Sequence, residues 1–128
     1  MEYAKKELLL NLCVVSFVLS LLYGLTAACM DRLAGSDASY ISGPGGAAVF
    51  MLFFLLSYLV HIIISLWSYA SAAIAGRPLF RRLVVFNVPG LLLICAIAFF
   101  AGSAVILAAV FTLLIFSIIM AVNTRKAR

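Results

Sequence analysis

The chain has 128 residues, of which 67% are apolar and only 10% are charged. Soluble domains carry about 25% charged and about 45–50% apolar residues, so four acidic and nine basic side chains cannot cover a surface exposed to water. The composition excludes a soluble enzyme, a DNA-binding module and a receptor with a folded extramembrane head. It predicts an all-α integral membrane protein, with residues 1–128 in a single membrane domain surrounded by the lipid bilayer.

Runs without charge predict the membrane-spanning helices, because about 20 apolar residues cross a bilayer. The first run covers 8–30, and the second begins in a loop-like Gly/Pro/Ser cluster at 42–46. The third run, 83–124, has about twice the length that one helix needs, and the small residues at 101–104 near its middle predict a tight hairpin. We therefore expect a four-transmembrane-helix bundle with approximate helix bounds 8–29, 47–72, 84–101 and 104–122.

The cations mark one side of this bundle. The first connection holds a single cation, Arg32, beside Asp31 and Asp37, and the hairpin near Gly102 holds none. The other eight lie in the N-terminal segment, the second connection and the C-terminal tail: Lys5, Lys6, Arg77, Arg81, Arg82, Arg125, Lys126 and Arg128. Short loops rich in Lys and Arg stay in the cytoplasm, so we expect both termini to be cytoplasmic and the protein to lie in the inner membrane of a bacterium.

The first predicted helix also has features of a signal peptide. Two lysines precede its apolar stretch, and Thr26-Ala27-Ala28 stands before Cys29 in the manner of a cleavage site. Cleavage there would leave three helices and place the Arg-rich connection and the tail on opposite sides of the membrane. We favour the uncleaved helix, because its apolar run is longer than a signal core and acidic residues dilute its basic start.

Small residues recur at every fourth position of the first helix: Ser16, Ser20, Gly24 and Ala28. Positions four apart lie on one helix face, and small side chains let another backbone approach closely in a membrane. We expect this face to pack against another helix of the same chain. The alternative is the seam of a homodimer.

The third predicted helix contains Asn87-Val88-Pro89-Gly90 in its first two turns. Proline removes a backbone donor and clashes with the preceding turn. Either the helix proper starts at Pro89, with Asn87 near the cap, or the helix kinks there. A kink would free backbone carbonyls, which could line a polar site inside the membrane.

His61, the one histidine, lies near the middle of the second predicted helix. Polar residues at spacings of four, four and three share its face of the helix: Ser57, His61, Ser65 and Ser68. This stripe must face other helices or water, because lipid offers no hydrogen-bond partner. With Asn87 and Pro89 it forms a candidate polar intramembrane site. His61 is either a neutral imidazole bonded to a serine, Asn11 or Asn87, or a group that relays protons or binds a polar substrate.

The sequence contains no signal for catalysis, a cofactor or a metal. The three cysteines share no short ligand spacing with His61 and suit small apolar filler positions. Small four-span multidrug exporters depend on an acidic residue in their first helix. Here no acid lies between Glu7, which we expect at the membrane interface, and Asp31. We therefore expect no catalytic residues, no cofactor and no metal.

These observations favour a small non-enzymatic protein that acts through helix–helix association with a membrane-protein partner or a second copy. An accessory subunit of a membrane complex and an immunity protein against a pore-forming toxin both fit. The alternative is a small oligomeric transporter or flippase that uses the polar stripe around His61. A haem- or quinone-associated subunit is a weaker option, since a bis-histidine haem would need a second histidine from a partner chain. We expect no nucleic-acid partner, because the sequence predicts no folded basic face.

Overall fold

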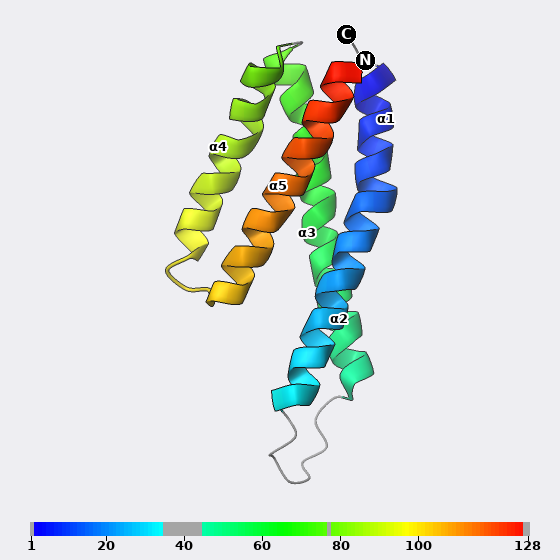
Figure 1. The fold of residues 1–128 in the computed structure, drawn as a ribbon, viewed down its shortest axis with the longest axis vertical. Coiled ribbons are helices and arrows are strands. Elements are labelled where there is room, and N and C mark those ends of the chain that lie inside the picture. Colours follow the sequence, from blue (N-terminus) through cyan, green and yellow to red (C-terminus); the bar gives the residue numbers. More distant parts are fainter. Residues whose placement is uncertain (1, 35–44, 77, 127–128) are drawn as a thin grey trace.

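The computed structural model describes residues 2–34, 45–76 and 78–126, and every regular element in these ranges is helical (Figure 1). The elements, in chain order, are α1 (Glu2–Leu10), the π-helical turn η1 (Asn11–Val15), α2 (Ser16–Ala34), α3 (Gly46–Ala75), α4 (Leu79–Ile97) and α5 (Ser103–Lys126). We call the continuous helix formed by α1, η1 and α2 the rod. The rod, α3, α4 and α5 are long and apolar enough to cross a membrane, which confirms the prediction of four apolar helices.

The four helices form two hairpins that lie alongside each other. The rod packs against α3, and α4 pairs with α5 (Figure 1). The first turns of α1, the last turn of α5 and the α3–α4 connection lie together at one end, which we call the termini end. At about 1.5 Å per residue, the 30 residues of α3 span about 45 Å and the 19 residues of α4 about 28 Å. The rod and α3 therefore extend past the α4–α5 connection at the opposite end (Figure 1).

The helices reach further toward the termini end than the sequence predicted. The rod begins at Glu2 rather than 8, α3 continues to Ala75 rather than 72, α4 begins at Leu79 rather than 84, and α5 continues to Lys126 rather than 122. The sequence prediction ended helices near the first charged residue. A charge limits how deep a side chain can lie in a bilayer. Near a helix end, however, a long charged side chain can extend to the membrane surface, so the backbone around it can stay helical.

Gly76 and Pro78 determine where α4 begins. Gly76 ends α3 with a φ of +69°, a left-handed conformation that glycine adopts without a steric penalty. Pro78 then stands directly before the first turn of α4. At the other end α4 stops at Ile97, four residues before the predicted 101, and the chain turns through Gly102 into α5.

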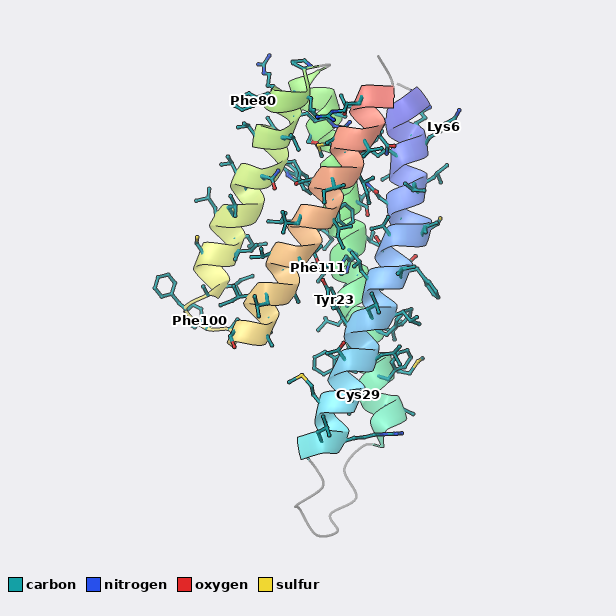
Figure 2. The ribbon with its side chains drawn as sticks, viewed as in Figure 1. Lys6, Tyr23, Cys29, Phe80, Phe100 and Phe111 are labelled. Carbon is teal, nitrogen blue, oxygen red and sulfur yellow. The ribbon has the colours of Figure 1, made fainter. Side chains whose placement is uncertain are left out.

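The interior of the bundle is more polar than its outside. Among the described residues, five apolar side chains are buried and ten polar or charged ones are. The apolar core is a small cluster shared by the rod, α4 and α5: Leu19, Phe86, Phe116 and Met120. Most large apolar side chains point outward instead, and Phe80 and Phe100, 80% and 94% exposed, point away from the bundle at opposite ends of α4 (Figure 2). This distribution is typical of helices that associate within lipid.

The stripe of small residues on the rod lies against α3 of the same chain. The Oγ atoms of Ser16 and Ser65 are 3.1 Å apart, and Ser20 is buried. At Gly24 an added Cβ would lie 3.1 Å from the ring of Phe50 and 3.2 Å from its carbonyl oxygen. Ala28, one turn further, is half-buried. Close approach of the two backbones therefore depends on the missing side chain of Gly24.

Substitution of Gly24 by isoleucine is expected to lower the free energy of unfolding by about 1–3 kcal/mol, because overpacking forces the rod and α3 apart. Unfolding in mixed detergent micelles, followed by circular dichroism, measures the change. The control is Leu25→Ile, at a neighbouring position that is 49% exposed, where the change should stay within about 0.5 kcal/mol. Equal effects at both positions would contradict the tight contact with α3.

Candidate functional site

Polar side chains line the contact between the rod and α3. We call them the polar row, and its members are Glu7, Asn11, Ser16 and Ser20 from the rod and Ser57, His61, Ser65, Ser68 and Ser71 from α3. All are buried except Ser57, which is half-buried. The stripe predicted on α3 therefore lies inside the bundle and faces the rod.

A π-helical turn brings the two parts of the rod's stripe onto one face. Asn11 and Ser16 are five residues apart, a step that would turn about 140° beyond one full turn in a continuous α-helix. In η1 the backbone N–H of Ser16 instead donates to the carbonyl oxygen of Asn11, and the Ser16 Oγ donates to the same oxygen at 2.7 Å. The wide turn absorbs the extra residue, so Glu7 and Asn11 join the buried face of Ser16.

A buried ion pair closes the polar row at the termini end. The Nη2 of Arg82, in α4, donates to Glu7 Oε1 at 2.5 Å. Ser68 of α3 donates to the same oxygen at 3.3 Å, and Arg82 Nη1 donates to Thr124 of α5 at 3.2 Å. These four residues, which we call the Glu7–Arg82 cluster, therefore tie all four helices together.

The placement of Arg82 corrects one expectation from the sequence, because Arg82 lies in α4 and not in a connection between helices. The position of Glu7 at a membrane interface stays a prediction. Both residues lie in helices, with side chains that are 4% (Glu7) and 8% (Arg82) exposed. Each charge compensates the other and receives further hydrogen bonds, which is the condition under which ionised groups are tolerated in a protein interior.

His61 lies near the middle of the polar row and links the row to α5. Its Nδ1 lies 2.6 Å from the carbonyl oxygen of Ser57; because a carbonyl only accepts, Nδ1 carries the proton. Its Nε2 lies 3.3 Å from Thr112 Oγ1. Thr112 Oγ1 is in turn 2.9 Å from the hydroxyl of Tyr23, which lies 2.9 Å from the carbonyl oxygen of Ala108 and points toward α5 (Figure 2).

A count of hydrogens shows what this chain of contacts can do. Tyr23 donates its hydroxyl hydrogen to the carbonyl oxygen of Ala108. With neutral His61, the single hydroxyl hydrogen of Thr112 serves either Nε2 or Tyr23, so one of these two contacts has no hydrogen. With protonated His61, Nε2 donates to Thr112, Thr112 to Tyr23, and Tyr23 to Ala108. One added proton on His61 thus gives every contact of this chain a hydrogen.

The remaining candidate site residues do not join His61. Asn87 donates from Nδ2 to the carbonyl oxygen of Leu83 at 3.0 Å and accepts from Ser117 at 3.0 Å, so it links α4 to α5. Pro89 is exposed and lies inside α4. The interpretation that the helix starts at Pro89, with Asn87 near its cap, is wrong. Of the partners proposed for His61, only the serine is found.

Sequence reasoning missed several members of this interior. Ser71 continues the stripe on α3 by one more step of three residues, and that step was visible in the sequence. Glu7 and Arg82 have opposite charges and lie near helix ends on the same side of the bundle, which was also visible. Asn11 could not be assigned to the stripe, because five residues separate it from Ser16 and the π-helical turn has no sequence signal here.

The other reactive residue types lie apart from the polar row. Cys13, Cys29 and Cys95 are free thiols on exposed surfaces, so they are not core fillers. Within the described ranges, no group of three or more His, Cys, Asp or Glu side chains could hold a metal ion. Comparison with protein-family models, curated proteins and solved structures finds no match to this chain.

Proposed function

We propose that the chain is a small multi-pass protein of a bacterial inner membrane that acts without catalysis, by associating with another membrane protein. The partner is either a larger membrane complex, to which this chain is an accessory subunit, or a pore-forming toxin that this chain blocks within the bilayer. The observation that carries the proposal is the distribution of polar and apolar side chains. Polar groups face the interior and bond between helices, whereas an apolar section of α3 stays exposed where it extends beyond the second hairpin.

The distribution of charge supports an orientation with both termini in the cytoplasm. Four cations are exposed at the termini end: Lys5, Lys6, Arg81 and Arg125. At the opposite end the described cation is Arg32, which lies next to Asp31 in sequence. Lys and Arg favour the cytoplasmic side. Of the other residues used for this prediction, Asp37, Arg77 and Arg128 lie outside the described residues.

Fusion of reporter proteins to the C-terminus tests this orientation. With a cytoplasmic C-terminus, fusion of green fluorescent protein should give fluorescent cells, and fusion of alkaline phosphatase should give an inactive phosphatase.

The length of α4 fits the thickness of a bilayer. Its 19 residues span about 28 Å, and the hydrocarbon core is about 30 Å thick. The first turns of α3 extend past Phe100 (Figures 1 and 2). They expose Met51, Leu52 and Phe53. We propose that a helix of the partner protein covers these side chains, because α4 and α5 do not reach them.

Site-specific photo-crosslinking in native membranes tests this association. A photoreactive amino acid at Leu52 should form a discrete adduct with a second, different polypeptide. The matched control is Leu92, which is 66% exposed on α4 and should form lipid adducts alone. Absence of any protein adduct at Leu52 would refute the proposal. Adducts with the mass of two copies of this chain would refute it in favour of a homo-oligomer.

A second candidate function is a small oligomeric transporter or flippase that uses the polar row around His61. The observation that favours it is the chain of contacts from His61 through Thr112 to Tyr23, in which a proton added to His61 would give every contact a hydrogen. Four helices enclose little space, so a dimer would supply the path for a polar substrate.

Proton movement into liposomes tests the second candidate. After the outside medium is acidified, protein-loaded vesicles containing a pH-sensitive dye should acidify faster than empty vesicles, and His61→Ala should remove most of the added rate, because it removes the imidazole that accepts the proton. Ser117→Ala, which removes a hydroxyl between α4 and α5, serves as the control and should retain the rate. Equal rates for the wild-type protein and empty vesicles would rule out a proton path.

A further inference from the structure

Asn11 is a buried amide without a hydrogen-bond partner. Its side chain is 1% exposed, and neither Nδ2 nor Oδ1 bonds to any other described residue. Two further buried atoms share this condition among the described side chains: Ser20 Oγ and Arg82 Nε. An unsatisfied buried polar group costs about 1–3 kcal/mol, and surrounding lipid gives such a group no alternative partner.

The unpartnered atoms of Asn11 and Arg82 belong to the same region of the bundle. Asn11 follows Glu7 by four residues, so both lie on the same face of the rod, and Glu7 holds Arg82 in the ion pair. Asn11 also opens η1, in which the backbone N–H of Ser16 donates to the carbonyl oxygen five positions earlier. Such wide turns in α-helices occur frequently at functional sites. The backbone carbonyl of Asn11 already accepts two hydrogen bonds from Ser16. The carbonyl is therefore satisfied, whereas the side-chain amide of Asn11 is not.

We propose that the Asn11 amide binds internal water beside the Glu7–Arg82 cluster. Water donates and accepts, which matches an amide that offers both a donor and an acceptor. An ion is a poorer match, because the nearby carboxylate and guanidinium neutralise each other. Buried waters in proteins typically make about three hydrogen bonds to otherwise unsatisfied polar groups, and Asn11 together with Arg82 Nε supplies such groups. The inference holds whether or not either proposed function is correct.

The chain contains its own control for this site. Asn87 is also an asparagine inside a helix of the bundle, but its Nδ2 donates to Leu83 and its Oδ1 accepts from Ser117. The two asparagines differ in whether protein groups satisfy them. Water should therefore contact the side chain of Asn11 and not that of Asn87.

Solid-state NMR of the full chain in liposomes tests the inference by transfer of magnetisation from water to side-chain amides. Transfer to the Asn11 amide should be at least about fivefold faster than transfer to the Asn87 amide, because a bound water lies within hydrogen-bond distance of the first alone. Asn11→Leu should abolish the water signal at the Nε–H of Arg82, and Asn87→Leu should leave that signal unchanged. Equal transfer to the two wild-type asparagines would overturn the proposal, as would an unchanged Arg82 signal in Asn11→Leu. If a polar solute other than water occupied the site, transfer to the two asparagines would also be equal.

Discussion

Replacement of Arg82 by methionine is expected to lower the free energy of unfolding by about 3–5 kcal/mol, because it leaves the Glu7 carboxylate buried without its counter-charge. Replacement of Glu7 by leucine should cost a similar amount, since it leaves the guanidinium unpaired. The double variant Glu7→Leu/Arg82→Met should recover most of the loss, because apolar residues replace a buried ion pair at little or no net cost. Unfolding in mixed detergent micelles measures all three variants against the wild-type protein.

The neighbouring arginine provides the control for this cycle. Arg81 is exposed, so Arg81→Met removes the same charge from the same turn of α4 and should change stability by less than about 0.5 kcal/mol. A cost below about 1 kcal/mol for Arg82→Met would mean that the ion pair of Glu7 and Arg82 is exposed to bulk solvent in the folded protein. Additive effects of the two single substitutions would mean that they do not interact.

Deletion of Leu9 is expected to destabilise the protein by about as much as the loss of Arg82, whereas deletion of Cys13 is expected to be tolerated. Loss of one residue from α1 rotates Glu7 by about 100° relative to Asn11 and removes it from Arg82, so about 3–5 kcal/mol is lost. Loss of one residue from η1 instead leaves Asn11 and Ser16 four residues apart. Their backbone hydrogen bond then becomes that of a regular α-helix, and Glu7 stays on the buried face.

The two deletions are matched, because Leu9 and Cys13 are both exposed apolar residues of the rod. Detergent unfolding measures stability, and the cost of Arg82→Met in each deletion background reports whether Glu7 still meets Arg82. Arg82→Met should still cost about 3–5 kcal/mol in the Cys13 deletion and should not destabilise the Leu9 deletion further. Equal destabilisation by both deletions would show that η1 is not a one-residue insertion in an α-helix.

Apolar runs in the sequence were sufficient to predict four helices, because crossing a bilayer imposes a minimum length. They were insufficient for the helix ends. Arg82 and Glu7 interrupt the apolar runs, yet both lie within helices, since each neutralises the other. Whether a charged residue can lie within a buried segment depends on an oppositely charged residue that is far away in the sequence. The residues next to it in the sequence do not contain that information.

The candidate site was predictable where helical periodicity is regular. The spacing of Ser57, His61, Ser65 and Ser68 places them on one face of α3, and this face lies against the rod. The contacts of His61 with Thr112 depend on how α5 packs, which the sequence of α3 does not specify. Asn11 was assigned no place in the stripe because its five-residue separation from Ser16 indicates a different face in an ordinary α-helix.

The separation of the ion-paired residues along the chain sets an order for biosynthesis. Glu7 and Arg82 are 75 positions apart, so at about 5–20 residues per second Arg82 is synthesised about 4–15 s after Glu7. When Arg82 is synthesised, the rod and α3 are complete, whereas the rest of α4 and all of α5 are still to follow. The Glu7 carboxylate therefore has no counter-charge until the second hairpin docks. Docking of the second hairpin is the last step of assembly, and a nascent chain that stops after α3 carries an uncompensated acidic group.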